Sequence, residues 1–335
     1  MSKLKSFIAE MPKCELHVHI EGTLEPEMKF ELAKRNKVKL PYKNEKALKA
    51  AYDFDDLPSF LAVYYEGMSV LLAEQDFFDV TYAYLAKARS QNVRYTEMFF
   101  DPQAHTARGV GFDTVIRGIR RAQLQAETTL GIRSQLIMCF LRDWSAEFAM
   151  TTLLQSLPYK EWIIGVGLDS DEKNNPPIKF AKVFARAKAE GYLLTMHCDV
   201  DQEGSVDHIW QTIREIGVNR IDHGVNSLED KKLVDEIKKR SLALTVCPIS
   251  NAYVTDGSKS AAIAKMLELG MRVTVNSDDP AYFPGYMTEN LMRVHKDAGL
   301  EKPELTQLTV NAFESAWLPR ATRDGFLAEL KAYAG

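Results

Sequence analysis

The sequence predicts an α/β protein, a (β/α)8 barrel with a helical insertion after its first strand, forming a single domain over residues 1–335. Two observations favour this fold class. Eight short, mostly apolar segments alternate with segments of helical periodicity, which is typical of parallel strands buried beneath helices. Each apolar segment also ends in polar residues, and a barrel collects its chemistry at the C-terminal ends of its strands. A doubly wound sheet fits this alternation less well.

The predicted strands follow one another with few interruptions. They cover residues 15–22, 93–100, 134–140, 163–169, 193–197, 220–224, 243–248 and 272–279. Helical periodicity appears over residues 113–131, 178–191, 205–217 and 261–270. The last three of these segments run into glycine, which commonly ends a helix.

The insertion lies between the first two predicted strands, where about 70 residues replace the dozen or so that one crossover needs. Within it, Phe60 and Tyr64 stand one helical turn apart. Such an aromatic stripe either packs on the barrel wall or covers a flat ligand as a lid, and the sequence leaves both readings open.

Composition and charge exclude several classes of protein. Apolar residues make up 46% and charged residues 26% of the chain, as in a soluble globular protein. A net charge of −4 argues against nucleic acid or an anionic membrane as partner. No apolar run is long enough to span a membrane, and the N-terminus has no apolar export segment. The four cysteines form no CxxC pair, so we expect reduced thiols and a cytoplasmic protein whose oligomeric state stays open.

The first predicted strand carries the strongest chemical signal. His17 and His19 alternate with apolar residues, so their side chains point the same way, about 7 Å apart along the strand. Two imidazoles aimed at one point suit a metal ion, although the spacing does not choose between zinc, iron, copper and nickel. The alternative is a pair of ordinary strand histidines with hydrogen-bond partners.

Other strand ends strengthen the metal hypothesis. His197 ends the fifth predicted strand, His223 the sixth, and Asp278 the eighth. Because all these ends open onto one barrel mouth, His17, His19, His197 and Asp278 can converge on one ion. Three or four protein ligands with an open position describe a catalytic site. The fourth strand has no lysine to bridge a second metal, so we expect one ion per chain.

Four motifs make the interpretation specific. They are MPKCELHVHIEG at residues 11–22, IDHG at 221–224, CPISN at 247–251 and NSDDP at 276–280. In this order, and spanning nearly the whole chain, they resemble the adenosine/adenine deaminase family of the amidohydrolase superfamily. The resemblance implies one zinc ion held by His17, His19, His197 and Asp278. It also implies that His223 lies beside the attacking water and that Asp279 hydrogen-bonds to that water and to the purine.

Three further details resemble adenine deaminases more than nucleoside deaminases: residues 21–26, 167–170 and 279–283. The resemblance therefore implies Glu21, Ser170 and Asp279 as substrate-binding residues. It implies zinc-dependent hydrolysis of adenine or an N6-substituted adenine to hypoxanthine, with release of ammonia or an amine. The alternatives are an adenosine deaminase, a deaminase of another heterocycle such as a pterin, and a purine binder without activity.

One departure falls on a catalytic position. The family usually has Ala-Gly-Glu after the strand-five histidine, and the Glu protonates the ring nitrogen. Here Val200 stands at that position, and the next helix begins about two residues later than expected. Such an insertion brings Glu203 forward as the acid, with Asp199 and Asp201 as rivals. Alternatively, Glu203 is a first-turn carboxylate favoured by the helix dipole.

Overall fold

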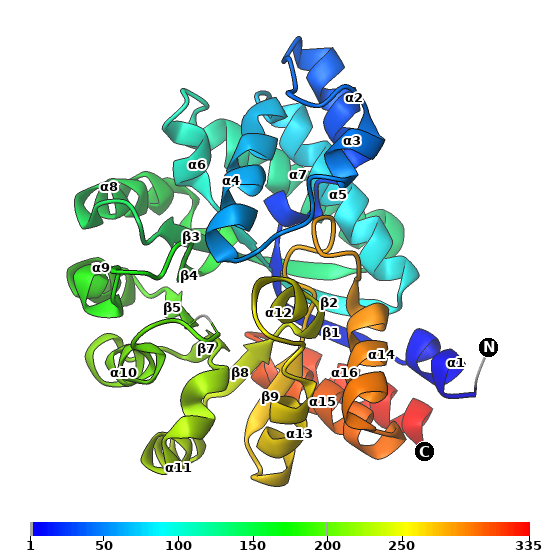
Figure 1. Ribbon diagram of the computed structural model, residues 1–335. Helices are drawn as coiled ribbons and strands as arrows, with labels where there is room; N and C mark the ends of the chain where they lie inside the picture. Colours follow the sequence, from blue (N-terminus) through cyan, green and yellow to red (C-terminus); the bar gives the residue numbers. More distant parts are fainter. Residues whose placement is uncertain (1–2, 199) are drawn as a thin grey trace.

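The computed structural model describes residues 3–198 and 200–335. Parallel strands form a central barrel, and helices surround it (Figure 1). The strands are β1 (Lys13–His19), β2 (Val93–Phe100), β3 (Arg133–Leu141), β4 (Ile163–Asp169), β5 (Leu193–Leu194), β6 (His197–Cys198), β7 (Arg220–His223), β8 (Ala243–Val246) and β9 (Arg272–Val275). They run in sequence order around the barrel, which confirms the predicted α/β barrel.

The barrel closes between its first strand and the segment that follows its last one. Val18 forms a parallel bridge with Asp278. The amide of His19 donates to the Asp278 carbonyl at 3.0 Å, and the amide of Asp278 donates to the His17 carbonyl at 3.1 Å. The backbone that closes the barrel therefore also brings three predicted metal ligands together.

The prediction of one continuous fifth strand over residues 193–197 was wrong. The structure divides it into β5 and β6, with Thr195 and Met196 between them. The amide of Thr195 still donates to the carbonyl of Val166 on β4 at 3.0 Å, and the Met196 carbonyl accepts from the amide of Asp222 on β7 at 2.9 Å. The barrel wall is thus continuous although neither residue counts as strand.

The crossover helices lie outside the barrel and bury one apolar face each. They are α7 (Phe112–Leu130), α8 (Ala146–Ser156), α9 (Ala181–Ala189), α10 (Ser205–Gln211), α11 (Lys231–Lys239) and α13 (Ser260–Glu268). The predicted helix over 205–217 changes character partway, because a π-helical turn, Thr212–Ile216, follows α10. Beyond β9 come α14 (Met287–Ala298), α15 (Lys302–Ser315) and α16 (Arg320–Ala334), while α1 (Lys3–Glu10) precedes β1.

Between β1 and β2 the chain is largely helical. This segment comprises α2 (Pro26–Asn36), α3 (Glu45–Lys49), α4 (Leu57–Gly67) and α5 (Glu74–Ser90), with single 3-10 turns at Glu21–Thr23 and Met68–Val70. Asp56 caps α4, because its side chain accepts from the amide of Ser59 at 2.9 Å. The cap fixes where α4 begins and therefore which of its residues face the barrel mouth.

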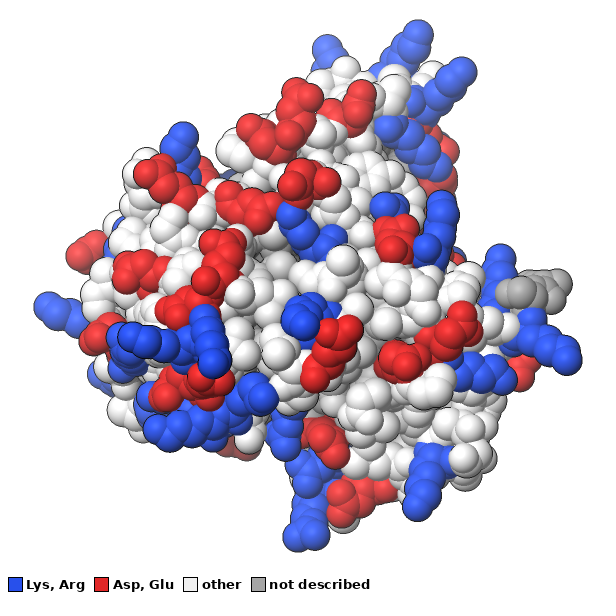
Figure 2. All heavy atoms as spheres, turned by 60° about the horizontal axis from the view of Figure 1, so that its bottom comes forward, with Lys and Arg blue, Asp and Glu red and all other residues white. Residues whose placement is uncertain are grey.

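Two short helices follow strand ends directly, α6 (Pro102–Thr106) after β2 and α12 (Pro248–Val254) after β8. Both begin with proline, whose fixed φ suits the first turn of a helix. On the face drawn in Figure 2, basic and acidic side chains are interspersed, in keeping with the small net charge. Within the described ranges, no helix is both long and apolar enough to cross a membrane.

Candidate active site

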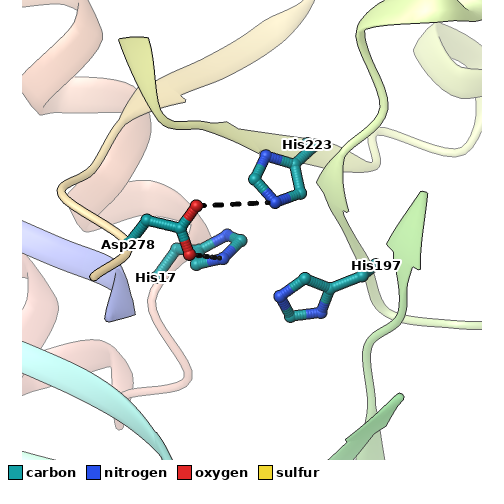
Figure 3. Close-up of side chains that lie close together, drawn as sticks. All are labelled: His17, His197, His223 and Asp278. Atoms are coloured by element: carbon teal, nitrogen blue, oxygen red, sulfur yellow. Dashed lines mark ion pairs between the residues drawn. The ribbon is translucent and has the colours of Figure 1, made fainter. Parts of the chain in front are cut away.

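Four side chains from separate strand ends face one another at the barrel mouth (Figure 3). In His17, His197, His223 and Asp278, one nitrogen or oxygen of each lies within 4.8 Å of those of the others. His17 Nε2 lies 3.1 Å from Asp278 Oδ1, and His223 Nε2 lies 3.8 Å from Asp278 Oδ2. All four residues are buried, so their polar atoms face each other away from solvent.

His19 joins the same cluster from β1. Its Nε2 lies 3.2 Å from His197 Nε2 and 3.4 Å from Asp278 Oδ1. The structure therefore brings together the whole set that the sequence singled out. Within the described part of the chain, His17 Nε2 is buried without any hydrogen-bond partner. A buried imidazole nitrogen of this kind, facing a carboxylate and two other imidazoles, fits a divalent metal.

Burial sets the protonation of these histidines. It lowers the pKa of His19 to about 4 and that of His223 to about 4. It also holds the pKa of His197 well below its usual value, and the neighbouring His17 adds to this effect. Burial opposes protonation of His17 too, but the charge of Asp278 outweighs it and the net shift of the His17 pKa is upward. Neutral imidazoles keep a lone pair for a metal.

Unusual backbone geometry marks the same strand ends. Asp278, His223 and Ser170 have φ angles of +65°, +56° and +75°, in the left-handed region that side-chain-bearing residues rarely adopt. Such strain persists where the surrounding structure imposes it, often at functional sites. Gly22 is required here for a steric reason, because a Cβ at this position would lie 2.0 Å from Asp279 Oδ1. Only glycine leaves room for that carboxyl.

Asp279 points into the space beside the cluster. Its side chain is buried, and its Oδ1 makes no hydrogen bond within residues 3–198 and 200–335. Burial, followed by the charge of Asp278, raises the pKa of Asp279 well above its usual range. The carboxyl lies beside Asp278 and lines the cavity, so water or a ligand can reach it.

A cavity of about 620 Å³ opens above the cluster and reaches solvent at its mouth. Its floor is polar and holds His19, Asp101, Asp169, His197, His223, Asp278 and Asp279. Its roof is mostly apolar and holds Leu57, Phe60, Leu61, Tyr64, Tyr65, Val254 and Phe283. The aromatic stripe on α4 thus fits both interpretations that the sequence left open, packing against the barrel and covering a ligand site. Phe60 packs on Phe283 with ring centroids 4.6 Å apart, and it also covers the cavity.

The three predicted substrate-binding residues differ in position. Asp279 and Ser170 line the cavity, and the Tyr65 hydroxyl donates to Ser170 Oγ at 2.8 Å. Glu21 is not among the residues that line it. Its Oε1 lies 2.8 Å from His105 Nε2 and accepts from the amide of Asp101 at 3.1 Å. The Glu21 carboxylate therefore contacts residues at and just before α6.

The structure places Glu203, predicted as the acid, outside the cavity. Its side chain is exposed and does not line the cavity, whereas Val200 and Gln202 from the same loop do. Asp201 is directed away as well and pairs with Lys259 at 2.6 Å. The third rival, Asp199, lies outside the described residues. The insertion after His197 lengthens the loop outward, so it does not move Glu203 toward the barrel axis.

Two floor carboxyls received no role in the sequence analysis. Asp101 and Asp169 lie beside His19, with the nearest polar atoms of all three within 4.8 Å of one another. Burial, then the charge of Asp169, raises the pKa of Asp101 well above its usual range. Burial also raises the pKa of Asp169 to about 7. The sequence did mark both positions, because Asp169 ends a buried strand and Asp101 directly follows one.

These positions yield a direct prediction. Glu203→Gln should leave kcat/KM unchanged to within about threefold, as expected for a surface substitution. Asp101→Asn makes the same chemical change inside the cavity and should lower kcat/KM by about tenfold or more, since hydrogen bonds to buried charged groups are worth about 1.5–3 kcal/mol. Steady-state kinetics of both variants would test this pair. A larger loss in Glu203→Gln than in Asp101→Asn would restore Glu203 as the acid.

A parallel barrel that gathers three imidazoles and a carboxylate at the C-terminal ends of its strands defines the amidohydrolase class of metal-dependent hydrolases. Comparison with known proteins narrows this class. The adenosine deaminase family matches residues 12–333. The chain belongs to this family.

Individual relatives are similar to this protein over nearly its whole length. An uncharacterised deaminase of Schizosaccharomyces pombe is 52% identical, over 100% of this chain and 99% of that protein. An adenine deaminase of Chlorobium phaeobacteroides is 49% identical, over 98% of each. The crystal structure of an adenine deaminase from Arthrobacter aurescens superposes with a TM-score of 0.93 at 41% identity, covering 96% of this chain and 99% of that one.

Proposed function

We propose that this protein is a zinc-dependent deaminase that hydrolyses adenine, or an N6-substituted adenine, to hypoxanthine and releases ammonia or an amine. The observation that carries the proposal is the convergence of His17, His19, His197 and Asp278 at the floor of a cavity roofed by aromatic side chains. The full-length similarity to adenine deaminases supports the choice of a purine base. A cytoplasmic location stays a prediction.

We assign one zinc ion per chain to the four ligands. Three imidazoles and one carboxylate are a typical donor set for catalytic zinc, with room for a further ligand. When bound, zinc makes water a strong nucleophile at neutral pH. The hard carboxylate oxygens of Asp278 and the imidazole nitrogens around them fit this ion better than a soft one such as Cu(I).

His223 and Asp279 flank the place where water must attack. Both line the cavity, as Asp278 does. In the proposed mechanism they orient the water and accept its proton, which is general base catalysis. His223 suits this role because its imidazole is neutral and its Nε2 faces the ligand cluster.

Asp101, Asp169 and Ser170 form the part of the cavity that we assign to ring recognition. A carboxyl that keeps its proton donates a hydrogen bond, while a carboxylate accepts one. The raised pKa values of Asp101 and Asp169 let the pair offer both. A free purine base presents ring N–H and N atoms together, whereas a nucleoside carries ribose where the N–H would be.

This arrangement predicts that the free base is preferred. Adenine should exceed adenosine in kcat/KM by on the order of 10⁴, because a site built to bind an N–H strongly rejects an analogue without it. The test measures loss of substrate absorbance and release of ammonia or amine with adenine, N6-substituted adenines, adenosine and a pterin. A higher kcat/KM for adenosine than for every free base would overturn the proposal. Tight purine binding without product would indicate a binder.

A further inference from the structure

Behind the proposed metal ligands lies a layer of buried polar side chains with no role so far. We propose that Asp222 and Thr245 act as positioning residues, which fix the proton of His17 on Nδ1 and thereby turn its Nε2 lone pair toward the metal. Asp222 also faces Nδ1 of His197. The inference rests on the metal site of the proposed function, but it concerns metal binding and not deamination.

The two residues sit side by side inside the barrel. Asp222 on β7 and Thr245 on β8 are direct partners in the parallel ladder, and both are fully buried. Thr245 Oγ1 lies 3.0 Å from Asp222 Oδ1 and 2.8 Å from His17 Nδ1. The threonine hydroxyl therefore bridges the carboxylate and the histidine.

The direction of these hydrogen bonds follows from the chemistry of the groups. An ionised carboxylate only accepts, so the single hydroxyl proton of Thr245 is donated to Asp222. The remaining contact of that hydroxyl, with His17 Nδ1, is then one in which the oxygen accepts. His17 must carry its proton on Nδ1, which leaves a lone pair on Nε2. That nitrogen faces Asp278 at 3.1 Å.

The charge of Asp222 is supported from other directions. The hydroxyl of Thr195 donates to its Oδ2 at 2.7 Å, and the guanidinium Nε of Arg220 lies 3.7 Å from its Oδ1. Arg220 is itself buried, hydrogen-bonded to Glu97 and stacked on the Trp317 ring at 4.4 Å. Two donating hydroxyls and a nearby cation therefore surround this acceptor.

Asp222 faces a second metal ligand as well. Its Oδ2 lies 3.6 Å from His197 Nδ1, while His197 Nε2 lies on the other side of the ring, 3.2 Å from His19 Nε2. A negative charge behind Nδ1 favours the tautomer with its proton there. One carboxylate thus holds His17 through Thr245 and lies behind the ring of His197 without a hydrogen bond to it. Ligand histidines are commonly held by a carboxylate in this way.

We call the hydrogen bonds from His17 through Thr245 to Asp222 the relay. It predicts a specific effect of removing the Thr245 hydroxyl. Thr245→Val keeps the shape of the side chain but breaks the link between Asp222 and His17. The dissociation constant for zinc should rise by about 10–100-fold, the usual effect of losing a group that orients a metal ligand. Thr245→Ser keeps the hydroxyl and should bind zinc as the unaltered protein does. Titration of metal-free protein against a chromogenic chelator measures these constants without any substrate.

Thr274→Val is the matched control. Thr274 is also fully buried and is the ladder partner of Thr245 on β9, but its hydroxyl contacts the Leu244 carbonyl and the Asn276 amide, not a histidine. It should lower the melting temperature of the metal-free protein about as much as Thr245→Val does, while leaving the zinc affinity unchanged. Equal losses of zinc affinity in the two valine variants would mean a general packing effect and would overturn the relay.

A second measurement needs no metal. In a two-dimensional NMR spectrum of the metal-free protein with ¹⁵N-labelled histidine, His17 should carry a proton on Nδ1, whether or not the Asp278 carboxylate 3.1 Å away also draws one onto Nε2, and Thr245→Val should remove this preference for Nδ1. An Nδ1 without a proton in the unaltered protein would refute the inference even if the enzyme deaminates adenine. Conversely, a protein that shows the Nδ1 tautomer but binds no zinc would contradict the proposed function and leave the hydrogen-bond relay intact.

Discussion

Asp278→Ala is expected to abolish both zinc binding and deaminase activity. Asp278 contacts His17 and His19 directly and faces His223, so its removal takes away the one carboxylate ligand and its charge from a cluster of buried imidazoles. His17→Ala should have the same effect. Because water then has its ordinary pKa near 15.7 in place of about 7, the loss should exceed the about 10²–10⁴ expected from one acid–base group.

The measurement is the metal content of purified protein by elemental analysis, together with product release from adenine. The unaltered protein should contain about one zinc per chain, as the four assigned ligands require. Asp256→Ala serves as control, since this carboxylate is 83% exposed and belongs to a surface pair with Lys259. Full zinc occupancy in Asp278→Ala and His17→Ala would disprove the assigned ligand set.

Asp279→Asn is expected to retain zinc but to lower kcat by about 10²–10⁴, the usual contribution of a general acid or base. Asparagine has nearly the same size and fits beside Gly22, so the fold should not change. What is lost is a carboxyl that lines the cavity and can exchange a proton with water or substrate. The experiment compares kcat, zinc content and melting temperature with those of the unaltered protein.

Two results would speak against this role. A kcat within tenfold of the unaltered value would mean that Asp279 only binds substrate. Loss of zinc from Asp279→Asn would make Asp279 a metal ligand, which its place in a group with His19 and Asp278 also allows on geometry alone. Retained zinc together with a much lower kcat would support two different roles for the adjacent aspartates, Asp278 as a metal ligand and Asp279 as a proton-transfer group.

The sequence by itself determined the barrel and the side chains that gather at its mouth. Strand alternation fixed the common direction of His17 and His19, and polar residues at strand ends marked His197, His223 and Asp278. These inferences succeed because they depend on local periodicity and on a rule of the fold. Parallel strands that close into a barrel must bring their C-terminal ends to one mouth, whatever the details of packing.

Only the tertiary structure decided the roles that depend on the path of a loop or on neighbours distant in sequence. Glu203 stands at a suitable distance from His197 along the chain, but its loop turns outward and exposes it. Glu21 lies next to the metal-binding strand, yet His105, 84 residues away, takes its carboxylate. The contact of Thr245 with His17 joins β8 to β1 across the barrel. Side-chain partners of this kind arise from the closure and register of the whole barrel, which no local pattern encodes.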